Sequence, residues 1–165
     1  MTRTRAIDNN QDIIDSRDVI ARINRLGGEL EDRHNGELER ATVEAETDDE
    51  PIEQVTADFE EWLKERHDED DTDACELIAL RALAEEGESL ADWKHGEALI
   101  RETYFEDYAR DLHEDINGSG ATGWPYDYID WERAAGALLT DYMSLDFDGV
   151  TYYARDCALT RRSES

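Results

Sequence analysis

Residues 41–154 carry charge of almost one sign. They hold 33 Asp and Glu residues but only 7 Lys and Arg, so −26 of the chain's formal net charge of −27 lies in this segment. The densest stretch is HDEDDTD, where five of the six residues from Asp68 to Asp73 are carboxylates. Neighbouring like charges repel, whereas ordinary protein surfaces interleave both signs. Such a field repels nucleic acid and anionic membranes and attracts basic surfaces over ~10 Å at moderate salt. We therefore expect no direct nucleic-acid binding and a partner with a basic groove.

The chain nevertheless contains enough apolar residues for a packed fold. Hydrophobic residues make up 39% of it, with 4 Trp, 7 Tyr and 3 Phe, against the disorder that high charge and low mean hydropathy would favour. Most aromatic residues lie beyond residue 90, which predicts a C-terminal core. The first half is poorer in core-forming residues, so we expect it to need a partner chain.

No targeting or membrane segment is evident. The sequence has no run of eighteen apolar residues and no apolar stretch of a secretory signal near its start. The two cysteines, Cys75 and Cys157, lie far apart and lack CxxC spacing. We interpret them as reduced thiols of a cytoplasmic protein, with an intramolecular disulfide as the alternative.

Residues 16–40 have the pattern of an amphipathic helix that Ser16 caps and that Gly27-Gly28 bends or ends. Its apolar stripe is long for a segment with little nearby to cover it, which predicts that residues 1–41 form a helical arm of a homodimer. In the alternative, the stripe packs on the Ile52–Leu63 helix of the same chain. The stripe consists of Val19, Ile20, Ile23, Leu26 and Leu30.

Residues 42–50 are acidic without apolar periodicity and predict a mobile connector, followed by an acidic helical domain over 51–165. Pro51 suits the start of a second helix that runs to about Arg66. A third helix is capped by Thr72 or Asp73 and stops at Gly87. Residues 98–103 predict either a short strand or the lead-in to the next helix.

The last third predicts two more helices and a hairpin. Residues 104–116 place one apolar face on a helix, made of Phe105, Tyr108, Ala109, Leu112 and Ile116. Residues 129–143 predict a helix capped by Asp130, and Asp148-Gly149 between two β-prone runs predicts a β-hairpin. The expected fold is mainly α with a small β element (α+β): amphipathic helices plus a C-terminal helix–β-hairpin unit.

Motifs of catalytic and cofactor sites are not found in the sequence. Read from Asp68, the acidic run lacks the Gly and Glu of an EF-hand at positions six and twelve. The histidines and cysteines have no zinc-site spacing, and neither a phosphate-binding loop nor a GxSxG elbow occurs. We therefore expect no enzymatic activity, no metal site and no cofactor.

The carboxylates themselves remain as candidate binding residues. On a helix, residues three or four apart stand ~5–6 Å apart, close to the spacing of neighbouring phosphates along a DNA strand. Rows of this kind can imitate a duplex backbone to a basic groove, although each row alone is more typical of the solvated face of an amphipathic helix. The candidate phosphate-mimicking residues are Asp58, Glu61, Glu65, Asp68, Glu69, Asp70, Asp71, Asp73, Glu102, Glu106, Asp107, Asp111, Glu114 and Asp115.

The stretch Tyr128–Arg155, YIDWERAAGALLTDYMSLDFDGVTYYAR, resembles the C-terminal part of the ArdA antirestriction family. The shared features are the ID-aromatic-E opening, the small residue and leucine of the helix, the Asp-Tyr close and the Gly-x-x-Tyr ending before an Arg. Tyr104–Leu112, YFEDYARDL, is similar in style to an acidic-aromatic helix of that family. The resemblance implies a dimeric, acidic, plasmid- or phage-borne DNA mimic that occupies the DNA groove of type I restriction-modification enzymes.

Two functional hypotheses follow. The first is an acidic DNA-mimic inhibitor, encoded by a phage, plasmid or other mobile element, that blocks a restriction-modification or CRISPR-type defence enzyme as an antirestriction or anti-CRISPR protein. The second is a helical dimerisation or adaptor protein whose acidity reflects solubility or salt adaptation. The scarcity of lysine, with only Lys64 and Lys94 beside fifteen arginines, is compatible with the second hypothesis.

Overall fold

The computed structural model describes residues 5–47, 55–118 and 123–155. Its strands are β1 (Ile13–Asp15), β2 (Ala98–Arg101), β3 (Tyr142–Phe147) and β4 (Val150–Arg155). Its α-helices are α1 (Ser16–Thr47), α2 (Phe59–Asp68), α3 (Thr72–Gly87), α4 (Phe105–Asn117) and α5 (Trp131–Leu138). Three short 3-10 helices are η1 (Glu102–Tyr104), η2 (Tyr126–Tyr128) and η3 (Leu139–Asp141). The expected fold class, mainly α with a small β element, is confirmed.

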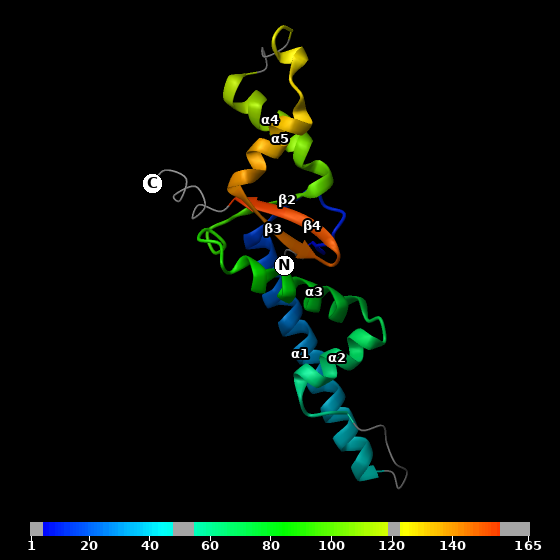
Figure 1. Cartoon of the computed structure of the whole chain (residues 1–165). Coiled ribbons are helices and arrows are strands. Elements are labelled where there is room, and N and C mark those ends of the chain that lie inside the picture. Colours follow the sequence, from blue (N-terminus) through cyan, green and yellow to red (C-terminus); the bar gives the residue numbers. More distant parts are fainter. Residues whose placement is uncertain (1–4, 48–54, 119–122, 156–165) are drawn as a thin grey trace.

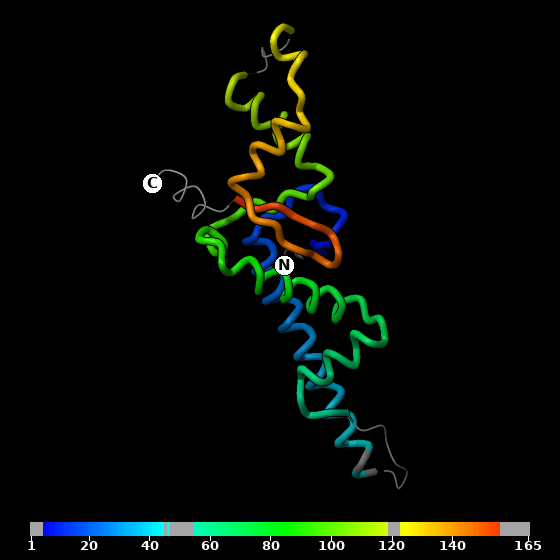
Figure 2. Tube along the Cα trace, in the orientation of Figure 1, coloured from blue at the N-terminus to red at the C-terminus, as the bar shows by residue number. Residues whose placement is uncertain are grey.

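The molecule is elongated, with the sheet between two helical parts (Figure 1). The strands form one antiparallel sheet in the order β1-β2-β4-β3. The α4–α5 hairpin projects from one side of the sheet, and α1, α2 and α3 lie on the other. Figure 2 shows that the C-terminal end of α1 and the yellow segment 123–130, which leads to α5, are at opposite ends of the chain trace.

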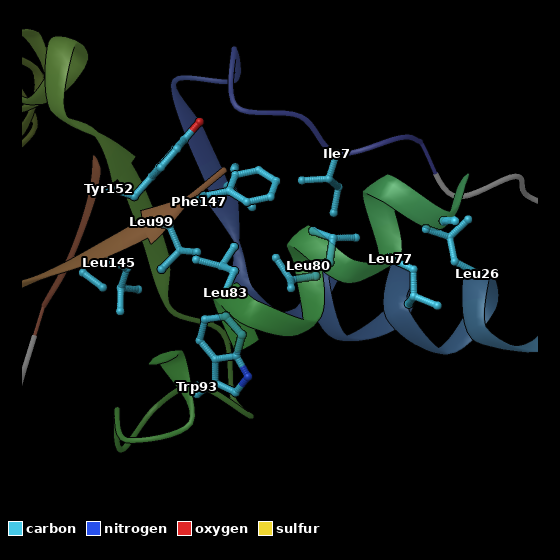
Figure 3. Close-up of a cluster of buried hydrophobic side chains, with 14 of the residues drawn as sticks. Ile7, Leu26, Leu77, Leu80, Leu83, Trp93, Leu99, Leu145, Phe147 and Tyr152 are labelled. Carbon is cyan, nitrogen blue, oxygen red and sulfur yellow. The ribbon is translucent and has the colours of Figure 1, made fainter. Parts of the chain in front are cut away.

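The main hydrophobic core joins α1, α2 and α3 to one face of the sheet. Figure 3 shows the part of this core to which α1, α3 and the strands contribute. Its leucines recur at helical spacing along α1 and α3, and its sheet residues alternate along the strands, as a half-buried sheet requires. The first half therefore contributes its apolar residues to a core within the chain itself, and its need for a partner chain stays a prediction. The most completely buried members include Leu26, Leu30, Trp62, Leu77, Leu80, Leu83, Leu99, Leu145, Phe147 and Tyr152.

A second, smaller core lies between the opposite face of the sheet and the α4–α5 hairpin. It contains Ile100, Phe105, Ala109 and Ala135, with Tyr153 packed against it. Side chains of successive strand residues point to opposite faces, so Leu99 belongs to the first core while its neighbour Ile100 belongs to the second. We call residues 102–141, which the second core attaches to the sheet, the α4–α5 lobe.

The predicted hairpin is confirmed. β3 and β4 pair so that Phe147 faces Val150, leaving Asp148 and Gly149 as the two-residue turn. Both turn residues have positive φ, 49° and 85°, which matches the preference of such turns for Asp-Gly.

Several predicted boundaries are wrong. α1 continues through Gly27-Gly28 to Thr47, so residues 42–47 are helical and do not belong to a connector; residues 48–54 lie outside the described part. α2 begins at Phe59 because Asp58 caps it, later than the predicted start at Pro51. The cap of α3 is Asp71 rather than Thr72 or Asp73.

The prediction that Ser16 caps the first helix is also wrong, because its hydroxyl bonds to the segment before β2. The Ser16 hydroxyl donates to the Trp93 carbonyl at 2.7 Å and accepts from the Glu97 N–H at 2.6 Å. These two bonds fasten the start of α1 beside β2.

In the described residues, no helix is both long enough and apolar enough to cross a membrane.

Candidate acidic interface

The fourteen candidate carboxylates fall into two groups that the fold separates. Those from Asp58 to Asp73 lie on α2 and at the start of α3, whereas those from Glu102 to Asp115 lie on η1 and α4. The two groups are on opposite sides of the sheet (Figure 1). They therefore do not form one continuous surface, and each group has its own local environment.

Part of the α2–α3 group is engaged in holding the fold. Asp58 accepts the N–H groups of Glu60 and Glu61 at 2.9 and 3.3 Å, which satisfies free donors at the start of α2. Glu61 accepts the Thr56 hydroxyl at 2.9 Å, and Glu69 pairs with Arg66 at 3.2 Å. These carboxylates have structural partners in addition to solvent.

Asp71 is the clearest structural carboxylate of this group. It accepts the Ala74 N–H at 3.2 Å as the cap of α3 and forms an ion pair with Arg33 of α1. Burial opposes its ionisation, but the Arg33 guanidinium and the N–H groups of the helix end outweigh that effect and lower the pKa of Asp71. Asp71 therefore helps to hold α1 against α3.

The α4 carboxylates, Glu106, Asp107, Asp111, Glu114 and Asp115, are all exposed. The opposite side of the helix buries Phe105 and Ala109 in the second core. Within residues 5–47, 55–118 and 123–155, no salt bridge joins an α4 carboxylate to a Lys, Arg or His side chain. Asp111 accepts the Tyr104 hydroxyl at 2.9 Å. This row of charges is therefore directed to solvent.

A basic residue on the same helix does not neutralise the row. Arg110 lies with its guanidinium carbon 5.4 Å from the centre of the Trp131 ring, a cation–π contact between α4 and α5. Its charge is therefore used in packing the two helices together. The α4 carboxylates remain the largest group of exposed anions without an ion-pair partner among the predicted site residues.

The positions of these anions are unfavourable for the helix itself. Asp107, Asp111 and Asp115 follow one another at a spacing of four residues, where like charges destabilise a helix. Glu114 and Asp115 also lie near the C-terminal end, where the helix dipole favours cations, and the last turn contains no basic residue. Residues that disfavour their own secondary structure in this way are expected at functional sites.

Replacing Glu114 by Gln and Asp115 by Asn is therefore expected to stabilise the protein by about 0.3–1 kcal/mol per substitution. As matched controls, Glu106→Gln and Asp107→Asn in the first turn remove favourable charge–dipole interactions, so they are expected to be less stabilising or destabilising. The free energies of unfolding of the four single variants, measured in urea, give the order of these effects. Equal effects at both helix ends would contradict this account of the row.

The predicted dimerisation stripe is covered by the chain itself. Val19, Leu26 and Leu30 are at most 1% exposed and belong to the main core, and Ile20 and Ile23 are half-buried against it. The stripe packs chiefly on α3 rather than on the predicted Ile52–Leu63 helix. A second copy could cover almost no further surface of Val19, Leu26 and Leu30, so we do not assign these three residues to an interface. The homodimer stays a prediction.

One group of exposed residues was missed by the sequence patterns. Ile116, predicted on the buried face of α4, is 73% exposed, and Trp124 and Tyr128 are 82% and 80% exposed. All three lie at or between the ends of α4 and α5. Trp124 and Tyr128 have no helical periodicity, and only their position in a loop rich in glycine distinguishes them from core aromatics.

Among the described residues, no three His, Cys, Asp or Glu side chains converge as the ligands of a metal ion would. Comparison with known proteins finds no matching family model, no similar curated protein and no similar solved structure.

Proposed function

We propose that this chain is a DNA-mimic inhibitor that occupies the basic groove of a nucleic-acid-binding defence enzyme. The observation that carries the proposal is the exposed row of α4 carboxylates without ion-pair partners. The row from Glu106 to Asp115 occupies ten residues of α4, a length of about 15 Å, which corresponds to about four base pairs of duplex. The row thus offers anions over a stretch that a basic groove normally fills with phosphates.

The shape and charge of the whole molecule support the same function. The protein is elongated, with the α4–α5 lobe projecting from the sheet (Figure 1), so the row can enter a groove without obstruction by α1 and α2. The net charge of −27 would accelerate encounter with a basic surface. The resemblance of residues 128–155 to the ArdA family includes α5 and the hairpin that carry this lobe.

In this mechanism, the inhibitor competes with DNA by satisfying the same Lys and Arg side chains. The carboxylates are already fixed on a helix, so little conformational freedom is lost on binding. No covalent step is involved. Inhibition is therefore reversible and weakens as salt screens the charges.

A displacement assay tests the proposal. A fluorescent duplex bound to a purified type I restriction-modification enzyme, or to a CRISPR effector complex, is titrated with the protein. Competition predicts that the duplex is released, that more DNA restores binding, and that added salt weakens the inhibitor. If neither enzyme releases its duplex at a large excess of the protein, the proposed function is wrong.

The alternative explanation of the acidity, adaptation to salt, makes a different prediction for stability. If the carboxylates serve binding, the two hydrophobic cores should keep the protein folded below ~0.1 M salt, where repulsion between exposed charges is least screened. The far-ultraviolet circular dichroism should then change little across a salt titration. Loss of the helical signal on lowering the salt would instead favour salt adaptation.

A further inference from the structure

The far end of the α4–α5 lobe exposes large apolar side chains. Ile116 lies in the last turn of α4, while Trp124 and Tyr128 lie in the segment that leads to α5. They are three of the five large hydrophobic residues of the described chain that are strongly exposed, and the two aromatics are its most exposed members. We call these three residues the apolar tip.

The segment that carries the two aromatics is held in a defined conformation. The Asp127 N–H donates to the Gly123 carbonyl at 2.9 Å, and the Gly123 N–H donates to the Asp127 carboxylate at 3.2 Å. The Tyr128 N–H donates to the Pro125 carbonyl at 3.1 Å. These bonds close a turn over residues 123–128, so the aromatic side chains extend from an ordered backbone.

His113 fixes this turn to α4. Its ring lies 5.2 Å from the ring of Tyr126 and 5.5 Å from the ring of Trp131, both in edge-to-face contact. The lobe therefore uses two aromatic residues to build its end, while Trp124 and Tyr128 are left outside that packing. Exposed apolar side chains on an ordered backbone are suited to binding because the backbone needs no further ordering when a partner covers them.

The charge around the tip restricts the partner. Residues 111–132 contain six Asp and Glu, one His and no Lys or Arg. The tip residues thus belong to an acidic part of the chain, and protein interfaces commonly combine apolar contacts with polar surroundings. A complementary surface has an apolar pocket bordered by Lys and Arg.

The same charges argue against two other occupants. A second copy of this chain that docked on the tip would bring together two acidic segments without Lys or Arg, and like charges across an interface oppose association. An anionic membrane would be repelled for the same reason. A basic protein surface is the occupant that the charges favour.

We propose that Ile116, Trp124 and Tyr128 anchor the protein in an apolar pocket at the edge of its partner's basic groove. This inference rests on the proposed function, because it places the pocket on the enzyme whose DNA groove receives the α4 carboxylates. The carboxylates satisfy the basic side chains, and the tip supplies contacts that DNA does not make. Tryptophan and tyrosine in such positions typically dominate interface affinity.

The test measures binding to the enzyme whose duplex the protein displaces. Trp124→Ala is expected to weaken affinity by about thirtyfold or more, and by the same factor at low and high salt, because the lost contact is apolar. Ile116→Ala is expected to weaken it less. Val43→Ala is the matched control, since Val43 is also exposed, at 60%, but lies on α1 away from the lobe. It is expected to leave affinity unchanged.

The outcomes distinguish the role of the apolar tip from that of the α4 carboxylates. If Trp124→Ala and Tyr128→Ala bind as the parent does while neutralised α4 variants bind weakly, the tip inference is overturned and the proposed function stands. If the tip variants lose affinity while neutralised variants do not, mimicry fails and the tip remains. Sedimentation of the parent and Trp124→Ala without enzyme provides a further check. A dimer that becomes monomeric on this substitution would assign the tip to self-association and overturn the inference.

Discussion

Replacing Glu76 by alanine is expected to lower the free energy of unfolding by about 3–5 kcal/mol. Glu76 of α3 accepts two hydrogen bonds from Arg22 of α1, Nε at 2.8 Å and Nη2 at 3.0 Å, and a third from the Ile7 N–H at 2.9 Å. The two side chains are only 11% and 10% exposed. Removing the carboxylate takes two hydrogen bonds from a nearly buried guanidinium and one from a backbone donor. Equilibrium unfolding in urea measures the loss.

An exposed ion pair on α1, the helix that contains Arg22, provides the control. Arg25 and Glu29 form an ion pair at 3.1 Å with Glu29 56% exposed, so Glu29→Ala is expected to change stability by about 0.5 kcal/mol or less. The double variant Arg22→Met, Glu76→Leu should recover most of the loss, because a buried pair can often be replaced by apolar residues without penalty. Similar values for Glu76→Ala and Glu29→Ala would contradict this account of how α1, α3 and the N-terminal segment are joined.

Replacing Gly87 by alanine is expected to destabilise the protein by about 1–3 kcal/mol. A Cβ at this position would lie 2.5 Å from Cε3 and 2.8 Å from Cη2 of Trp93, which is itself only 3% exposed. The ring is confined by the main core, so the core must repack. The measurement is the unfolding midpoint, together with the near-ultraviolet dichroism of the tryptophans.

Gly28→Ala serves as the opposite case. Gly28 lies inside α1, and apart from its own helix backbone and chain neighbours no atom lies within 4 Å of an added Cβ, so alanine is expected to stabilise the helix by about 1 kcal/mol. The two glycine substitutions should therefore shift stability in opposite directions. A stabilising Gly87→Ala would show that Trp93 does not pack against α3 as described.

Some parts of the fold that depend on local chemistry were predictable from the sequence. The Asp148-Gly149 turn, the cap at Asp130 and the helices around Leu77 and Phe105 each have a signal within a few residues, and each is present. Short strands have no such signal. β1 has three residues and β2 has four, and they form because their partners in the sheet pair with them.

The candidate site was also predictable only in part. Helical spacing predicted that the carboxylates of α4 would share an exposed side. It could not show that Asp58 and Asp71 would be used as caps, since a cap and a free anion have the same residue type. The stripe from Val19 to Leu30 was equally ambiguous, because covering it required α3, which is more than forty residues away in sequence.

The most direct test of the central claim compares two variants that each lose four negative charges. One carries Asp107→Asn, Asp111→Asn, Glu114→Gln and Asp115→Asn on α4. The other carries Glu31→Gln, Asp32→Asn, Glu39→Gln and Glu85→Gln, which are exposed positions of α1 and α3. Both are titrated against the same enzyme–duplex complex at one salt concentration.

If the α4 carboxylates imitate phosphates, the α4 variant requires about tenfold or more protein to release the duplex, while the control variant acts nearly as the parent does. Both variants should remain folded, because exposed carboxylates contribute repulsion rather than packing. Equal displacement by the α4 variant and the parent, or equal losses in the two variants, would contradict the claim that this row is the binding site.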